Sequence, residues 1–502
     1  MTKRLVTLVL SVCFLLATVL VAPETVLAQQ EEYFPENWQA AERVILSAWD
    51  NYEDEADVSE FNIDLDDTDV FCDRLSSRNP EYFYVTVFNI GYSSASDYVL
   101  TVYFDYFYTQ DKVVEMREKI EQKANSVLNS IPDNLADEEK LLFLYDYIAS
   151  NNNYDFLVFS DYNENLKPEI RTVYGCLINN LSICEGIAQT LIYFCKRLDI
   201  ECYAVGSDSM NHEWNMVKLG NNYYHIDITY ASPGFEKDTE GGQFQPYGYI
   251  SHDYFLISDK QIKSLDHKGW DIPFLATDST TYEKAYWKNV FGQVGFVDGF
   301  AYFIRNGKLS RCNLSSGAIT DLYIIPKCYF KSKDGYKRIW VPYTVTDDSE
   351  GSGFHTIFSF DYERNNLYFE MGNTAYSYNV NTKSIVSVYS LSKTGYILSL
   401  CYKNNRLYMT TNDINDKIKT EAFYFGEKSL SADKLPDYTG ALFYAGDIDL
   451  NGKIGISDVL ALKKYLAKAV AEISLENADI NKDDVINLLD LARLKVIYMN
   501  MK

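Results

Sequence analysis

Apolar residues recur at helical spacing in three stretches of the chain. From 113 to 131 and from 136 to 150 they return every three or four positions, and Pro132 ends the first of these stretches. The third stretch, from Ser182 to Leu198, is apolar at positions 187, 188, 191, 194, 195 and 198. This periodicity predicts an amphipathic helix that begins near Cys184.

Two β patterns follow this third helix, at 211–219 and 223–230. If Gly220-Asn221 forms a two-residue hairpin turn between them, His212 lies diagonal to Asp227 on the same face of the hairpin. A register shifted by one residue would put the two side chains on opposite faces. The predicted His–Asp pair therefore depends on this one turn.

From 286 to 425 the pattern changes to short alternating strands separated by turns rich in Asn, Gly and Asp. A weak repeat recurs here: a strand, a turn and a second strand that ends in Tyr plus an apolar residue, at Tyr302, Tyr368 and Tyr408. The last two copies are 40 residues apart, which is near the size of a propeller blade. This region is predicted to be a β-rich module, either propeller-like or a sandwich.

Composition narrows the classes of function. The 502 residues carry a formal net charge of −25, and 47% of them are apolar against 23% charged, which disfavours a wholly disordered chain. So acidic a protein would be repelled by nucleic acid and by anionic membranes. The excess of carboxylates is instead compatible with calcium binding.

The N-terminus has the pattern of a targeting segment. Lys3 and Arg4 precede an apolar stretch over 5–21, and the small residues of Val26-Leu27-Ala28 suit cleavage. This predicts a secretory signal peptide over 1–28. No later stretch has the roughly 18 apolar residues that a bilayer span needs, so we expect a secreted, extracellular protein.

The expected mature chain is multidomain. The predicted regions are an N-terminal α/β region at 29–130, an α+β core at 131–275, the β-rich module at 286–425 and a small all-α calcium-binding domain at 441–502.

Cys184, His212 and Asp227 are the candidate catalytic residues. A thiol at a helix start meets unpaired N–H groups and the positive end of the helix dipole, which lower its pKa. His212 can take the thiol proton and Asp227 can orient the imidazole, which gives a nucleophile, a base and an orienting group. His225 shares a strand face with Asp227 and stays open as a rival base. Cys195, on the same helix face as Cys184, is interpreted as a core residue.

Two acidic loops near the C-terminus have the spacing of calcium-binding loops. Each offers oxygen ligands at positions 1, 3, 5 and 12 and a backbone carbonyl at position 7, and each is followed by a helix. Hard oxygen ligands at this spacing favour Ca²⁺ over other common cations, and two ions are expected. The predicted ligands are Asp447, Asp449, Asn451, Lys453 and Asp458 in the first loop, and Asp479, Asn481, Asp483, Val485 and Asp490 in the second.

Four short segments together resemble the core of the bacterial transglutaminase-like (papain-related) superfamily: Tyr174-Gly175, Ile183–Ala188, His212–Asn215 and Tyr224–Thr229. The resemblance covers roughly 130–275 and implies a papain-like α+β fold with Cys184 as nucleophile, His212 as base and Asp227 as orienting carboxylate. It also implies acyl transfer, in which the thioester passes to an amine or to water. Tyr174 is a candidate second donor to the oxyanion, beside the Cys184 backbone N–H.

Residues 445–500 resemble a type I dockerin, in which two calcium loops are each followed by a helix. The second loop departs from that pattern at Asp484, where Gly is usual, so it is expected to bind more weakly or to turn less tightly. The resemblance implies a cohesin partner on a scaffolding protein. Ile456-Ser457 and Leu488-Leu489 would lie in the recognition surface.

These observations predict a secreted thiol enzyme that acts on protein or peptide amides by cross-linking or hydrolysis, anchored by its dockerin in a cellulosome. The alternative is a catalytically inactive transglutaminase-like adaptor that binds protein or polysaccharide in the same complex. The reactivity of Cys184 separates the two hypotheses.

Overall fold

The computed structural model describes most of the chain. The described residues are 34–95, 97–155, 168–231, 235–236, 243–244, 248–270, 275, 277–325, 357–371, 374–391, 395–403, 406–413, 418–424, 448, 455–468, 473, 478, 480 and 485–500. The predicted signal peptide and most of the predicted calcium ligands lie outside these residues. Tertiary contacts divide the chain into two compact units: unit 1 comprises 1–128, 155–227 and 256–280, and unit 2 comprises 129–154, 228–255 and 281–502.

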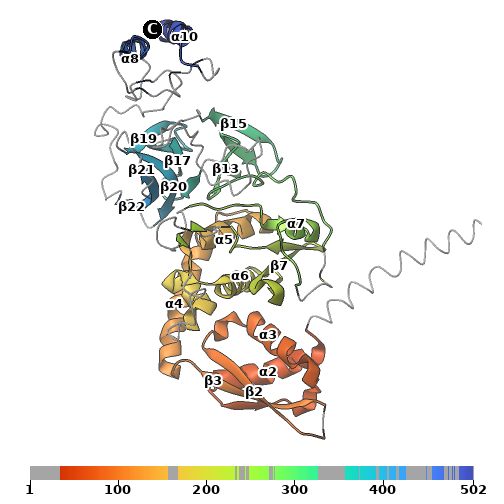
Figure 1. The fold of residues 1–502 in the computed structure, drawn as a ribbon. Helices are drawn as coiled ribbons and strands as arrows, with labels where there is room; N and C mark the ends of the chain where they lie inside the picture. Colours follow the sequence, from red (N-terminus) through yellow and green to blue (C-terminus); the bar gives the residue numbers. More distant parts are fainter. Residues whose placement is uncertain are drawn as a thin grey trace, which may run out of the picture. The chain divides into compact units, whose positions relative to one another are not determined.

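Unit 1 begins with helices and a three-stranded antiparallel sheet of order β1-β3-β2 (Figure 1). The elements are α2 (Glu36–Asp50), β1 (Glu55–Asp57), α3 (Thr68–Arg78), β2 (Val85–Tyr92), β3 (Val99–Tyr106) and α4 (Gln110–Leu128). Helix α4 confirms the helix predicted at 113–131, displaced by about one turn toward the N-terminus. The buried residues of α2, among them Ala41, Ile45 and Trp49, recur at helical spacing and join one hydrophobic core with residues of α3 and β3.

A second sheet of unit 1 has the order β11-β8-β7-β6, and α6 packs on β6 and β7. The strands of this sheet are β6 (Cys202–Ser207), β7 (His212–Leu219), β8 (Asn222–Ile226) and β11 (Phe255–Ile257). The other elements of this part of the chain are β5 (Leu181–Ser182), which is not in this sheet, α6 (Cys184–Leu198) and α7 (Asp259–Ser264). Helix α6 begins at Cys184, as the periodicity predicted. Its buried apolar side chains cover the sheet, which fixes where its N-terminus lies.

The register of β7 and β8 is the one on which the predicted His–Asp pair depends. Leu219 pairs with Asn222 and Lys218 with Tyr223, so Gly220-Asn221 is a two-residue turn. Gly220 has a φ of +61°, in the left-handed region where glycine is favoured. The predicted register is confirmed.

Unit 2 contains α5 (Asp137–Asn151), which confirms the helix predicted at 136–150. On α5, the buried Asp146 carboxylate lies 2.7 Å from His252 Nε2 and accepts a 2.8 Å hydrogen bond from the Val294 N–H. His252 Nδ1 in turn donates to the carbonyl oxygen of Val290 at 2.8 Å. This buried polar pair ties α5 to two segments more than 100 residues further along the chain.

The β-rich region of unit 2 folds, in its described part, into three antiparallel sheets in which neighbouring strands follow one another in sequence. They are β12 (Gly295–Val297), β13 (Phe300–Arg305), β14 (Lys308–Asn313) and β15 (Ile319–Ile324); β16 (Phe358–Asp361), β17 (Asn366–Met371), β18 (Thr374–Asn379) and β19 (Ile385–Ser390); and β20 (Gly395–Lys403), β21 (Arg406–Asp413) and β22 (Ile418–Tyr424). The weak sequence repeat is the first hairpin of each sheet, with Tyr302, Tyr368 and Tyr408 on its second strand. Unit 2 also has the short strands β4 (Asn153–Tyr154), β9 (Phe235–Glu236) and β10 (Gln243–Phe244).

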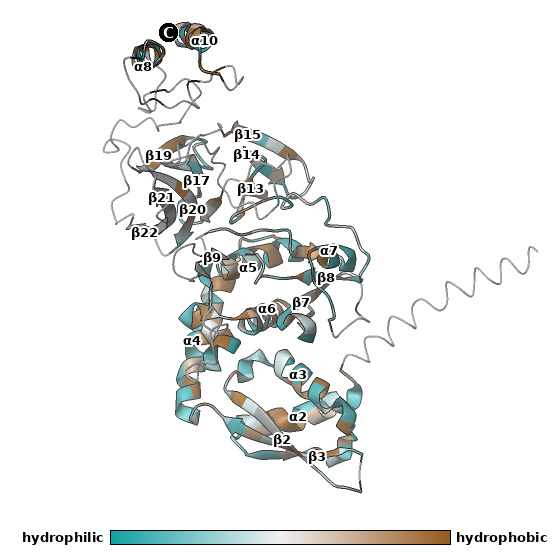
Figure 2. Cartoon of the chain, viewed as in Figure 1, coloured by the Kyte–Doolittle hydropathy of each residue, from teal (hydrophilic) through white to brown (hydrophobic). Residues whose placement is uncertain are grey.

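Two helices follow near the C-terminus, α8 (Ile456–Leu466) and α10 (Leu488–Asn500). Their apolar residues form a small core of their own, in which Val459 and Leu462 of α8 correspond to Leu491 and Leu494 of α10. Figure 2 shows both polar and apolar residues on each of these helices, as expected where one face is buried. Among the described residues, none of the helices has the length and apolar character needed to cross a bilayer.

Candidate active site

Cys184 is the first residue of α6 and is only 8% exposed. Its sulfur is hydrogen-bonded by His212 and by the backbone N–H groups of Glu185 and Glu213. Residue Ile183 before it is extended and does not cap the helix with its side chain, so the first N–H groups of α6 are available to a negative charge. The helix start and the strand β7 thus converge on one thiol.

His212 and Asp227 lie beside this thiol in unit 1. His212 Nε2 is 2.8 Å from Asp227 Oδ2, and the Asp227 side chain is fully buried. His212 opens β7, whereas Asp227 directly follows β8, and the two-residue turn between these strands brings them together. The structure therefore places the three sequence-predicted residues in one cluster, in the order sulfur, imidazole and carboxylate.

The pKa values in this cluster shift in directions that favour charged forms. Burial raises the pKa of the Cys184 thiol, but the hydrogen bond and the positive charge of His212 outweigh burial and lower it below its ordinary value. Burial lowers the pKa of His212, but the Asp227 carboxylate and the Cys184 sulfur raise it to about 10. Burial raises the pKa of Asp227, yet hydrogen bonds and charge from two imidazoles bring it well below its usual range. The cluster can hold a thiolate–imidazolium pair.

A second imidazole on Asp227 comes from His267, which sequence reasoning missed. His267 Nε2 lies 2.8 Å from the same Oδ2 atom that contacts His212. Within the described residues, the facing atoms of His212, Asp227 and His267 lie within 4.8 Å of one another, a spacing that a metal ion could also bridge. His267 follows α7 in a loop with no recognisable motif, so no sequence signal pointed to it.

His225, the rival base, has a different role. Its Nδ1 accepts a 3.0 Å hydrogen bond from the Trp214 indole N–H, so its Nε2 carries the proton and donates to Asp259 Oδ1 at 3.0 Å. Burial lowers the pKa of His225, with Asp259 opposing the shift, which agrees with a neutral ring. His225 is fully buried and engaged at both nitrogens, so it holds β8 against the α7 segment.

Two small features fix α6 against its neighbours. The buried Asn215 side chain on β7 donates a 3.1 Å hydrogen bond to the carbonyl oxygen of Ala188 on α6. Gly186 leaves room for a neighbouring backbone, because a Cβ atom there would lie 2.6 Å from the Ile170 carbonyl oxygen. Cys195, further along α6, is fully buried, as expected of a core residue.

Tyr174, the candidate oxyanion donor, is buried with its ring stacked on Phe83 at a centroid distance of 5.9 Å. Burial raises the pKa of nearby Tyr108 above its ordinary value, and a hydrogen bond with Glu169 and the charges of Glu169 and Tyr174 act in the same direction. The role of Tyr174 as an oxyanion donor stays a prediction.

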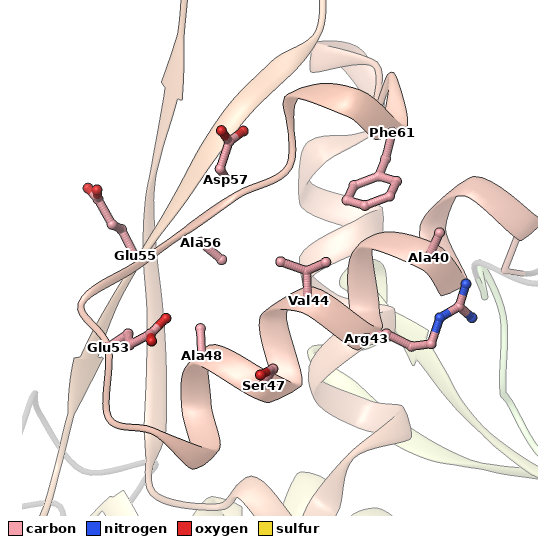
Figure 3. Close-up of a pocket in the computed structure, with 10 residues that line it drawn as sticks. All are labelled: Ala40, Arg43, Val44, Ser47, Ala48, Glu53, Glu55, Ala56, Asp57 and Phe61. Carbon is pink, nitrogen blue, oxygen red and sulfur yellow. The ribbon is translucent and has the colours of Figure 1, made fainter.

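An open hollow of about 540 Å³ lies between α2 and β1 (Figure 3). Its carboxylates are Glu53, Glu55 and Asp57, and its apolar lining includes Val44 and Phe61. It shares no residue with the cluster around Cys184. We therefore assign it no part in the chemistry of that cluster.

The described parts of the two acidic loops are built alike. Asp458 Oδ1 accepts from the Ile448 N–H at 2.6 Å and its Oδ2 from the Gly455 N–H at 2.7 Å. Thirty-two residues later, Asp490 makes the same two bonds with the N–H groups of Ile480 and Asn487, at 2.8 and 2.9 Å. Val485, a predicted carbonyl ligand, is described and has an exposed side chain. The predicted ligands outside the described residues are Asp447, Asp449, Asn451, Lys453, Asp479, Asn481 and Asp483.

Comparison with protein families identifies this C-terminal region. Residues 445–497 match the family model of the type I dockerin domain. The chain thus carries a C-terminal type I dockerin, a domain that typically binds calcium and that implies anchoring to a cohesin in an extracellular cellulosome. A search of curated protein sequences gave no match.

Several solved structures show distant likenesses. A crystal structure of a TGase matches at 13% identity over 30% of this chain and 46% of that chain, with a TM-score of 0.22. Menin matches at 12% identity over 41% and 38% of the two chains, with a TM-score of 0.19. Saccharomyces cerevisiae Sqt1 matches at 8% identity over 44% and 58%, with a TM-score of 0.17. The chain thus spans less than half the length of the TGase, and TM-scores this low carry no argument about fold or activity.

Proposed function

We propose that this protein is a transglutaminase-like thiol enzyme that transfers or hydrolyses acyl groups of protein amides, held by its dockerin on a cohesin-bearing scaffold. The observation that carries the proposal is the Cys184 sulfur at the start of α6, hydrogen-bonded to a His212 that Asp227 contacts at 2.8 Å. The resemblance of the surrounding sequence motifs to the transglutaminase-like superfamily supports the same reading. The papain-like fold of the core and the propeller-like fold of the β-rich module are part of this proposal.

In the proposed reaction, the Cys184 thiolate attacks the carbonyl carbon of an amide and forms a C–S bond. The resulting oxyanion accepts a hydrogen bond from the Cys184 backbone N–H, which lies in the first turn of α6 and has no acceptor within the helix. The His212 imidazolium gives its proton to the leaving nitrogen as the C–N bond breaks. Neutral His212 then takes a proton from the attacking amine or water, which releases the acyl group from the thioester and restores the thiolate.

Asp227 supports this cycle without contacting the substrate. Its carboxylate accepts from His212 Nε2 and thereby turns the other ring nitrogen toward the sulfur. It also stabilises the imidazolium, which is why the pKa of His212 rises to about 10. A carboxylate in this position keeps His212 protonated until the leaving nitrogen takes the proton.

The test is selective alkylation of Cys184 by iodoacetamide at pH 6, read by peptide mapping, in the wild type and in His212→Ala. Cys72 and Cys176 serve as internal controls, because burial raises their pKa values to about 12 and about 11. The proposal expects rapid modification of Cys184 alone, and loss of that reactivity in the variant. A Cys184 that reacts no faster than the two control thiols would refute it. If Cys184 reacts as the proposal expects, glutamine donors and peptides are then screened for acyl transfer.

One observation favours a second candidate, a catalytically inactive adaptor that binds protein or polysaccharide. Cys184 is only 8% exposed, and a buried thiol cannot meet a large substrate unless the site opens. Unreactive Cys184 together with unchanged binding of partners by Cys184→Ala would favour this adaptor.

A further inference from the structure

Strand β1 lies at the edge of its sheet and has one unpaired side. In the described part of the chain it pairs only with β3, in the sheet order β1-β3-β2. The backbone groups of Asp54 and Val58 bond to β3 at 2.9 Å. Backbone groups of alternate residues in an antiparallel ladder point to the same side, so those of Glu55 and Asp57 point away from β3. These N–H and C=O groups form the free edge of β1.

The free edge borders the open hollow between α2 and β1, because all three residues of β1 line that hollow (Figure 3). Its volume of about 540 Å³ is in the range of ligand pockets. Val44 is 39% exposed although it is apolar, and its side chain points from α2 toward β1 in Figure 3. Ala48, Ala56 and Phe61 belong to the same apolar lining. Unpaired backbone groups beside an apolar hollow suit an extended peptide, which can fill both.

The charges around the hollow favour a basic peptide. The lining carboxylates are Glu53, Glu55 and Asp57, and the lining cation is Arg43. All four side chains are exposed. Hydrogen bonds from Ser59 lower the pKa of Asp57 below its ordinary value, so this carboxylate is charged at neutral pH. A second copy of the chain would place like charges opposite one another across β1, which disfavours pairing of two copies.

The alternation of β1 determines which side chains such a peptide needs. Ala56 is buried in the core with Val102, whereas Glu55 and Asp57 are exposed on the opposite face of the sheet. In a strand added beside β1, the residues opposite Glu55 and Asp57 lie on that exposed face. The residue between them points to the same side as Ala56, which is the side of the hollow. Two basic residues with an apolar residue between them therefore match this edge.

We propose that the free edge of β1 and the adjoining hollow bind an extended peptide segment of the pattern basic–apolar–basic, which adds to the sheet as an antiparallel strand. The basic side chains pair with Glu55 and Asp57, and the apolar side chain packs on Val44 and Phe61. The existing sheet is antiparallel throughout, and antiparallel pairs are slightly more stable than parallel ones, which favours this direction. The site shares no residue with the Cys184 cluster, so the inference goes beyond the proposed function and does not depend on it.

The experiment measures binding of the fluorescein-labelled peptide Lys-Val-Lys-Leu-Lys-Val to the full chain, by fluorescence anisotropy at low ionic strength. Glu55→Gln/Asp57→Asn should weaken binding by about five- to tenfold, because two exposed ion pairs are lost. The asparagine keeps an oxygen acceptor for the Ser59 N–H, which bonds to Asp57 Oδ1 at 3.0 Å. The matched control, Asp111→Asn/Glu118→Gln, removes two exposed carboxylates of α4 and should leave binding unchanged. Equal weakening by the two double variants would show a response to net charge alone and would overturn the inference.

Two methylated peptides test the added strand itself. In antiparallel addition, the residues opposite Glu55 and Asp57 direct their N–H groups to β1, and the residues between them direct theirs to solvent. N-methylation of the three lysines should therefore weaken binding by about tenfold or more, whereas N-methylation of the valines and leucine should leave it nearly unchanged. Equal binding of the two methylated peptides, or no detectable binding of the parent peptide, would overturn the inference. Alkylation of Cys184 is expected to be the same in all the variants, so either result leaves the proposed function intact.

Discussion

The thiolate–imidazolium pair predicts an unusual dependence of stability on pH. The pKa of His212 rises from 6.5 to about 10 on folding, so its stabilising contribution is complete below pH 6.5 and is lost as the pH rises toward 10. Folding lowers the pKa of Cys184 from an ordinary value of 9.0, so its contribution is present above pH 9 and is lost as the pH falls through the folded value. Between the lowered pKa of Cys184 and pH 9 the two slopes are opposite and largely cancel.

Replacing Cys184 by serine removes the contribution of the thiol to the pH dependence of stability and leaves that of His212. In Cys184→Ser the hydroxyl stays neutral, while His212 keeps Asp227 and hence a raised pKa. The folded variant then binds about one proton more than its unfolded state in this window, so its free energy of unfolding should fall by about 1.36 kcal/mol per pH unit. For each pH unit between the lowered pKa of Cys184 and pH 9, the variant therefore loses up to about 1.36 kcal/mol relative to the wild type.

The assay is urea unfolding at half-unit steps from pH 6.5 to 8.5, followed by tryptophan fluorescence. Trp214 is buried and stacks on the His212 ring at 5.6 Å, so it reports on this site. Groups that titrate elsewhere in the chain contribute equally to the free energy of unfolding of both proteins. They therefore cancel in the difference between the two curves. Parallel curves for wild type and Cys184→Ser would show that the folded thiol is neutral, and the ion-pair reasoning would be wrong.

Three further predictions use other parts of the chain. Gly186→Ala should lower the melting temperature, because the new methyl group meets the Ile170 carbonyl oxygen and relieving that contact costs about 1–3 kcal/mol; an unchanged melt would contradict the packing. His225→Gln should cost about 1–3 kcal/mol of stability through its lost bonds with Trp214 and Asp259, yet leave the pH profile of Cys184 alkylation unmoved, because the lost ring is neutral. Chelation of Ca²⁺ should unfold residues 445–500 and abolish cohesin binding, checked by circular dichroism and pull-down; binding that persists in excess EDTA would be the contrary result.

Local features of the sequence predicted much of what the structure shows. The start of α6 at Cys184 follows from apolar periodicity, and the register of β7 with β8 follows from a two-residue Gly-Asn turn. Both depend on neighbours within about ten residues, which is the range over which periodicity and turn chemistry act. The three Tyr-bearing hairpins and the paired helices α8 and α10 were accessible for the same reason, since each repeats a local pattern.

The sequence did not reveal contacts between residues that are far apart along the chain. His267 meets Asp227 from 40 residues away, and His252 meets Asp146 from 106 residues away. A lone histidine in a loop carries no periodicity and no spacing rule, so its partner is known only once the sheet and α7 are packed. The same limit explains why His225 stayed open as a base until its bonds to Trp214 and Asp259 were seen.

The long-range histidine His267 also changes how the buried Asp227 carboxylate is held. A thiolate, one imidazolium and one carboxylate sum to a net charge of −1, and burying an unbalanced charge is costly even before the chain's own charge of −25 adds to it. Burial raises the pKa of Asp227, but contacts at 2.8 Å with both His212 and His267 bring it well below its usual range. These two contacts explain how an ionised carboxylate persists where Asp227 is fully buried and Cys184 is only 8% exposed. On this view the geometry of the site depends on a residue that lies 40 positions from Asp227 in the chain and outside the sequence motifs of the site.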